Sequence, residues 1–114
     1  MKRLLLFAVS LVAACEKGPD ADLQYVGEAR SLGAEWALVN EQARAGRLTR
    51  PYARTMRKSL REQIRSAASS LTAPGTRYGE EIRALLIEPD DAAPEAIRVH
   101  TDRLKQIEDS LESA

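Results

Sequence analysis

Thiol and imidazole side chains, which often act as a nucleophile, a base or a metal ligand, are rare in this 114-residue chain. It contains one cysteine, Cys15, and one histidine, His100, and no Gly-x-Ser-x-Gly turn that would expose a nucleophilic serine. Metal binding by His100 would need a carboxylate partner, but Ile97 occupies the place of the glutamate in a Glu-x-x-His pair. A lone histidine on an apolar helix face is more often a hydrogen-bonded packing residue than a base or a ligand. We therefore expect no hydrolytic triad and no metal site.

Glu80-Glu81 and Asp90-Asp91, two of the adjacent carboxylate pairs in the sequence, are candidates for acid–base chemistry such as cleavage of a cell-wall sugar. Neighbouring residues on a helix point about 100° apart, so the first pair would not face a single bond. The second pair precedes a helical segment and is better explained as helix capping. The sequence also lacks a glycine-rich phosphate loop, so we predict a non-enzymatic protein without a cofactor.

Basic residues are concentrated in the middle of the sequence. Residues 44–65 contain eight Lys or Arg and one acid, whereas residues 16–41 and 80–112 are acidic. Six of the basic residues recur at helical spacing, on a face roughly opposite Tyr52 and Leu60. They are Arg50, Arg54, Arg57, Lys58, Arg61 and Arg65. This candidate anionic-ligand face either binds lipid head groups, a phosphorylated glycolipid or an acidic protein, or is a solvated surface beside acidic helices.

The first fifteen residues, MKRLLLFAVSLVAAC, have the layout of an export signal. Two basic residues precede a run of eleven apolar or small residues, Leu4 to Ala14, which is too short to span a bilayer permanently. The run ends in Val12-Ala13-Ala14-Cys15, which resembles the lipobox of bacterial lipoproteins: an aliphatic residue and two small residues before a cysteine. The resemblance covers residues 1–15 alone.

The resemblance implies a set of maturation steps. The Cys15 thiol would receive a diacylglyceryl group, a peptidase would cut after Ala14, and the new amine would be acylated, for example with palmitate. Two or three acyl chains anchor a protein stably, whereas one gives only marginal binding. We therefore expect a signal peptide at 1–14, a lipidated N-terminus and tether at 15–20, and one helical domain at 21–114. The five residues after Cys15 span roughly 17 Å when extended, which keeps the domain near the membrane.

The resemblance also bears on location. Where lipoproteins are sorted by the residue after the cysteine, Asp retains them in the inner membrane, so Glu16 implies the outer membrane, facing the periplasm. Lipoproteins joined to peptidoglycan end in a lysine, whereas this sequence ends in Glu112-Ser113-Ala114, so we do not expect that covalent linkage. With Cys15 occupied by lipid, no disulfide is expected.

Composition favours helices as the elements that carry these residues. Ala, Leu, Arg and Glu dominate, and aromatic residues make up only 4% of the chain, which disfavours a β-sandwich. Apolar residues recur at helical spacing from Tyr25 to Ala43, Tyr52 to Leu71, Tyr78 to Leu86 and Ala93 to Ala114. The sequence thus predicts an all-α fold, a small antiparallel bundle of three long helices and one short helix.

Turn and capping residues set the expected helix ends. Gly46 would end a first helix over about 20–45 in a left-handed conformation. Thr49 would cap the second helix, and Asp90-Asp91 would cap the last. The short helix would span residues 77–88, ahead of a proline.

These features predict a membrane-anchored envelope lipoprotein that acts as a small helical interaction or structural module. Its thin apolar core favours an envelope protein partner or self-association. The alternative is binding of anionic envelope ligands through the basic face, and a cell-wall hydrolase finds no assembled site in the sequence. Nucleic acid is not an expected partner of an exported protein.

Overall fold

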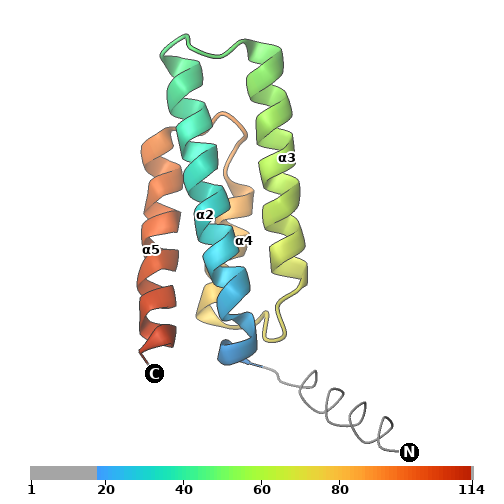
Figure 1. Ribbon diagram of the computed structural model, residues 1–114, viewed down its shortest axis with the longest axis vertical. Coiled ribbons are helices and arrows are strands. Elements are labelled where there is room, and N and C mark those ends of the chain that lie inside the picture. Colours follow the sequence, from blue (N-terminus) through green and yellow to red (C-terminus); the bar gives the residue numbers. More distant parts are fainter. Residues whose placement is uncertain (1–17, 114) are drawn as a thin grey trace, which may run out of the picture.

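The chain folds as a helical bundle in the computed structural model, which describes residues 18–113. Four α-helices and no strand form within that range: α2 (Pro19–Arg44), α3 (Arg50–Ser69), α4 (Arg77–Ile87) and α5 (Pro94–Glu112) (Figure 1). The all-α prediction is confirmed. The predicted signal peptide and Cys15 lie outside the described residues.

Helix α2 is the centre of the bundle. It packs against α3 on one side and α5 on the other, while the short α4 fills the space between α3 and α5 (Figure 1). Successive helices run antiparallel, with lengths of 26, 20, 11 and 19 residues, so the prediction of three long helices and one short helix is confirmed. The connection between α2 and α3, residues 45–49, forms one end of the bundle, which we call the hairpin end. The first turn of α2 and the last turn of α5 form the opposite end (Figure 1).

Most helix ends lie where the sequence predicts them. Thr49 caps α3 by accepting a hydrogen bond from the Tyr52 backbone N–H at 3.3 Å, and Gly46 adopts a φ of 74° after α2, as predicted. The prediction that Asp90-Asp91 cap α5 is wrong, because the helix begins at Pro94 with Ala93 as its N-cap and no side-chain cap. A proline at the first position has no N–H that needs a cap.

The core is built around the fully buried Trp36 of α2, with buried side chains from each of the other helices. The buried face of α3 passes through Ala53, Leu60 and Ile64. Tyr52 was predicted to belong to that face, but its side chain is 54% exposed, so that assignment is wrong. Residue 52 points about 100° away from residue 53 on a helix, which turns it to the rim of the bundle.

Helix α2 is buried more widely than its predicted apolar face. A second row of buried residues shares Ala29 and Trp36 with the predicted face, has the same alternating spacing and faces α4 and α5. Its members are Asp22, Val26, Ala29, Gly33, Trp36 and Asn40. A Cβ atom on Gly33 would lie 2.7 Å from Thr101 Cγ2 of α5, so the missing side chain lets these helices approach closely. The second row brings two polar side chains, Asp22 and Asn40, into the interior.

Candidate functional site

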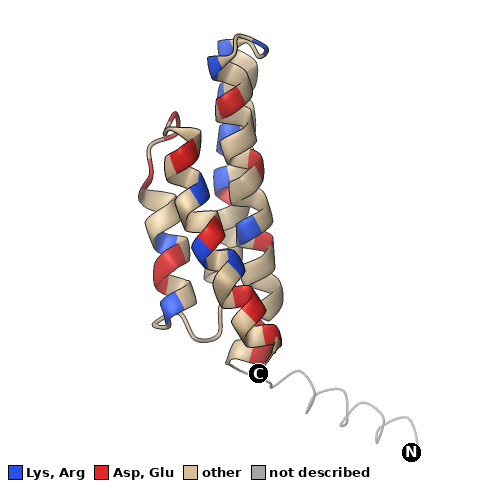
Figure 2. Cartoon of the chain, turned by 90° about the vertical axis from the view of Figure 1, so that its left-hand side faces the viewer, with Lys and Arg blue, Asp and Glu red and all other residues tan. Residues whose placement is uncertain are grey.

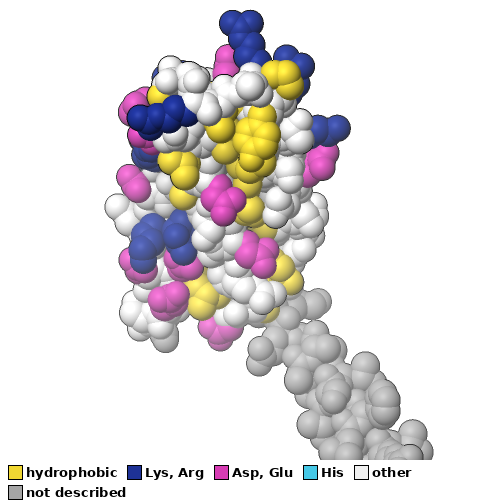
Figure 3. Space-filling view, turned by 45° about the horizontal axis from the view of Figure 1, so that its top comes forward, with side chains coloured by type: hydrophobic (Ala, Val, Ile, Leu, Met, Phe, Trp, Pro, Cys, Tyr) yellow, Lys and Arg dark blue, Asp and Glu magenta, His cyan; other side chains and the backbone are white. Residues whose placement is uncertain are grey.

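Charge is distributed unevenly along the bundle. Figure 2 marks several Lys and Arg positions around the hairpin end and several Asp and Glu positions at the opposite end. Seen with the hairpin end forward, apolar side chains are exposed between these basic side chains (Figure 3). The hairpin end is therefore the part of the surface best suited to a negatively charged partner.

The structure divides the six basic residues predicted to form one anionic-ligand face. Four of them are exposed and form no salt bridge with another residue of the range 18–113: Arg50, Arg54, Lys58 and Arg65. Arg57 and Arg61 are partly buried and turn toward the interior. The six side chains thus do not form one solvent-facing surface opposite the apolar face, because the basic flank adjoins the buried face of α3.

Arg61 holds the connection between α4 and α5. Its Nη1 and Nη2 donate to the carbonyl oxygens of Glu88 and Leu86 at 2.6 and 2.9 Å, and its Nε lies 3.0 Å from Asp90 Oδ1. The guanidinium carbon also lies 5.0 Å from the centroid of the Trp36 ring, a cation–π distance. With its donors directed at this connection, Arg61 has a structural role.

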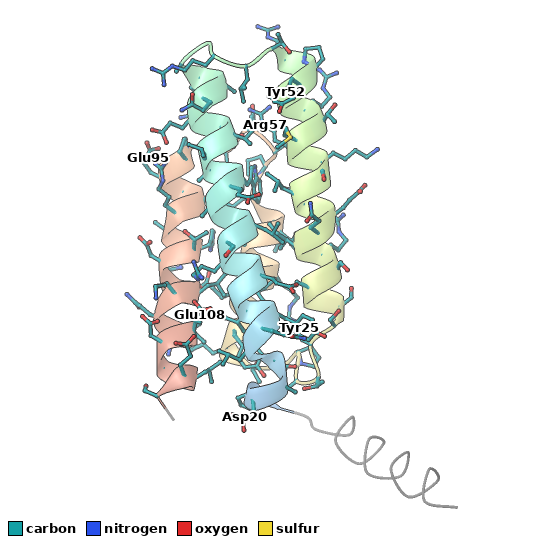
Figure 4. The ribbon with its side chains drawn as sticks, viewed as in Figure 1. Asp20, Tyr25, Tyr52, Arg57, Glu95 and Glu108 are labelled. Atoms are coloured by element: carbon teal, nitrogen blue, oxygen red, sulfur yellow. The ribbon has the colours of Figure 1, made fainter. Side chains whose placement is uncertain are left out.

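Arg57 is oriented by the buried Asn40 of α2. The Nε of Arg57 donates to Asn40 Oδ1 at 2.6 Å. Asn40 is itself fixed, since its Nδ2 donates to the carbonyl oxygens of Asp90 and Ala92 at 3.0 and 2.8 Å. Figure 4 shows Arg57 between α2 and α3 toward the hairpin end. One edge of its guanidinium is thereby used, and the two Nη groups form no hydrogen bond to another described residue.

A hollow at the hairpin end, which we call the tip pocket, gathers several of these arginines. It is lined by Ala43, Arg44, Leu48, Arg50, Ala53, Arg54, Arg57 and Asp91. A second hollow, farther along α3, is lined by Arg54, Lys58, Arg61, Glu62, Arg65 and Asp90. The tip pocket has one acid beside four arginines, whereas the second hollow has two acids, one of them already paired with Arg61.

His100 joins α5 to α4 through two glutamates. Its Nδ1 lies 2.7 Å from Glu81 Oε2 and its Nε2 lies 3.1 Å from Glu88 Oε1. The carboxylates lie against different ring nitrogens and do not converge on one point, which is consistent with the predicted packing role.

Asp22 forms a second buried polar cluster at the end opposite the hairpin. Its carboxylate accepts four hydrogen bonds, from the Thr72 N–H and hydroxyl, the Ala73 N–H and the Tyr78 hydroxyl, at 2.7–3.0 Å. Burial raises the pKa of Asp22, but these hydrogen bonds outweigh it and hold the pKa below 3.8. Burial and the bond to Asp22 raise the pKa of Tyr78. The cluster ties the start of α2 to the connection between α3 and α4.

Sequence reasoning missed the two polar residues that organise these clusters. In the sequence, Asp22 is an acid near the start of a predicted helix, which suits the positive end of the helix dipole, and nothing local singles out Asn40. The signal that would have found them is the second row on α2, in which both occur at the spacing of buried residues. A polar residue in such a row needs a partner inside the fold.

Within residues 18–113, no helix is long and apolar enough to cross a membrane, and no group of three or more potential ligands is placed to hold a metal ion. Comparison with family models, curated proteins and solved structures finds no match to the chain. The functional argument therefore depends on the sequence features and the geometry of this bundle.

Proposed function

We propose that the chain is an exported lipoprotein whose helical bundle is held at a membrane through Cys15 and works by binding an envelope partner. The observation that carries the proposal is the lipobox-like segment Val12-Ala13-Ala14-Cys15, at the end of an apolar run with a basic start. The first helix of the bundle begins at Pro19. Few residues therefore separate the proposed lipid from the folded domain.

The way in which the chain leaves the bundle supports this arrangement. The Gly18 N–H donates to the Thr72 hydroxyl at 2.8 Å, and Thr72 in turn donates to Asp22. Gly18 is thereby fixed at the end opposite the hairpin. A lipid on Cys15 would hold that end near the membrane, and Glu16 favours the outer membrane by the sorting rule described above.

The use of the polar side chains supports an interaction module over an enzyme. Asp22, Asn40, Arg61 and His100 each bond to a carboxylate or to the backbone of a connection between helices. These contacts stabilise the bundle and give each of these side chains a structural role.

Lipidation is tested with the full-length chain and a Cys15→Ser variant. We expect the wild-type chain to partition with membranes and its N-terminal peptide to carry acyl groups, and the variant to lack the acyl mass and remain unprocessed at residue 14. Ser10→Ala is the matched control, because it changes the apolar run and keeps the thiol. An unmodified Cys15 in membrane-associated wild-type protein would overturn the proposal.

A second candidate function is the binding of an anionic envelope ligand at the hairpin end. The observation that favours it is the set of arginines there that form no salt bridge among the described residues: Arg44, Arg47, Arg50 and Arg54. A basic surface without internal counter-charges attracts anions at longer range than one that is neutralised.

A further inference from the structure

We propose that the tip pocket binds a phosphate group, presented either as a free ion or as a phosphomonoester of a lipid head group. This inference deepens the second candidate function and rests on it. It replaces a general basic surface with one hollow between the ends of α2 and α3 and the connection that precedes α5.

The first argument is that Arg57 is held ready for a ligand. Its Nε is occupied by Asn40, and Asn40 is fully buried and bonded twice to the backbone. Ordering a free arginine side chain for a ligand costs conformational entropy, and here the fold has already met part of that cost. Arg57 is one of the residues that line the pocket, and its two Nη groups form no hydrogen bond to another described residue.

The second argument is the balance of charge. The lining has four arginines and one acid beside three apolar residues: Arg44, Arg50, Arg54, Arg57, Asp91, Ala43, Leu48 and Ala53. A phosphomonoester carries close to two negative charges near neutral pH and offers three acceptor oxygens. Several guanidinium forks can bind such a group at once, whereas a single carboxylate would leave most of them unused.

The third argument is that the other arginines of the pocket have almost no internal contacts that a ligand would have to break. Arg50 and Arg54 are exposed and form neither salt bridges nor side-chain hydrogen bonds within residues 18–113. Arg44 has one long contact, 3.5 Å from Nη2 to the Asp91 carbonyl oxygen. A ligand would therefore replace water at these groups and break no strong internal contact.

The test uses the mature lipidated chain, which begins at Cys15, in a neutral detergent, titrated with inorganic phosphate by calorimetry. Arg50→Gln with Arg54→Gln removes two pocket charges, and Lys58→Gln with Arg65→Gln removes two charges from the same helix outside the pocket. We expect the pocket variant to bind about tenfold more weakly or worse, and the control to change by less than about twofold. Circular dichroism checks that both variants keep their helices.

The affinities of the two variants for phosphate distinguish failure of this inference from failure of the function on which it rests. Equal weakening in both variants would overturn the pocket and leave a diffuse anion-binding surface. Absence of saturable binding to the wild-type chain would overturn both. Asp91→Asn supplies an opposite prediction, because removal of the one acid from the pocket should tighten binding.

The source of the phosphate is resolved by a second titration, in which the chain from residue 15 onward, with Cys15→Ser so that no acyl chain inserts into the bilayer, is mixed with vesicles of phosphatidylcholine containing or lacking phosphatidic acid. Binding to the phosphatidic acid vesicles that the pocket variant loses and the control keeps would assign a lipid head group. Saturation by inorganic phosphate without such vesicle binding would assign a free ion. Vesicle binding that both variants retain would overturn the pocket as the head-group site.

Discussion

At the scale of single residues, Asp22 is the side chain on which the end of the bundle opposite the hairpin most depends. Its carboxylate accepts two backbone and two hydroxyl hydrogen bonds from one connection and the start of α4. Replacement by asparagine would place an amide N–H₂ against donors. We expect Asp22→Asn to lower the free energy of unfolding by about 2–3 kcal/mol. Urea denaturation of the chain from residue 15 onward, with Cys15→Ser, would measure it, and a change no larger than that of the exposed Asp20→Asn would contradict it.

The same residue predicts a pH dependence. Because the folded-state pKa of Asp22 is held below 3.8, its charged form stabilises the fold at all pH values above the ordinary aspartate pKa. That contribution is lost as the pH falls from the unfolded-state pKa through the lowered folded-state pKa. The difference in unfolding free energy between wild type and Asp22→Asn should therefore be constant above about pH 5 and shrink below about pH 4. A difference that stays constant down to about pH 2 would exclude Asp22 as its source.

At the scale of elements, the approach of α5 to α2 depends on Gly33. A Cβ there would meet Thr101 Cγ2 at 2.7 Å and Leu85 Cδ2 at 3.1 Å. Alanine is the better helix former by about 1 kcal/mol, but overpacking costs about 1–3 kcal/mol, so we expect Gly33→Ala to be destabilising by about 1 kcal/mol. Adding Thr101→Ser removes the clashing methyl and keeps the hydroxyl that bonds to the Arg98 carbonyl. The double variant should regain stability relative to Gly33→Ala, and a failure to do so would argue against this contact.

The connection between α4 and α5 is held by side chains of two other elements, Asn40 and Trp36 of α2 and Arg61 of α3. Arg61→Met would leave the Leu86 and Glu88 carbonyl oxygens without their donor, and we expect a loss of about 2 kcal/mol. The Ala92 amide, which donates to the Pro89 carbonyl oxygen, should exchange its hydrogen faster in this variant. Arg65→Met is the matched control, one turn farther along α3 and exposed. Equal exchange at Ala92 in both variants would refute the role given to Arg61.

Contacts between sequence neighbours could be predicted from the sequence, whereas contacts between distant residues could not. The four helices follow from apolar periodicity and from local caps such as Thr49, which involve neighbours in the sequence. The polar clusters join residues about fifty positions apart, as Asn40 joins Asp90 and Ala92, and no local pattern encodes such a contact. The predicted basic face shows the same limit. The spacing of its residues on α3 was evident. Whether an arginine is free to bind a ligand or is bonded within the fold depends on the element that packs opposite it.

At the scale of the whole molecule, the two ends of the bundle have different roles. The end where Gly18 leaves the fold is tied together by the Asp22 cluster, and the hairpin end carries the unpaired arginines. Helix α2 has 26 residues, which places these ends about 39 Å apart. A bundle anchored through Cys15 could thus hold its tip pocket well away from the anchoring membrane, or bring it to that membrane by lying flat. The vesicle titration distinguishes a pocket that meets lipid head groups from one that does not.

Cooperativity between the two ends can be followed at Trp36, the only tryptophan in the chain. Its indole N–H donates to the Asp90 carbonyl oxygen at 2.9 Å, its ring lies under Arg61 and its side chain is fully buried. Fluorescence of Trp36 therefore reports contacts among α2, α3 and the connection to α5. Since small helical domains usually unfold in one step, we expect the fluorescence and far-ultraviolet circular dichroism transitions in urea to coincide. A fluorescence change at lower urea would instead mean that the hairpin end opens while the helices around Asp22 persist, and the pocket would then be a separately unfolding unit.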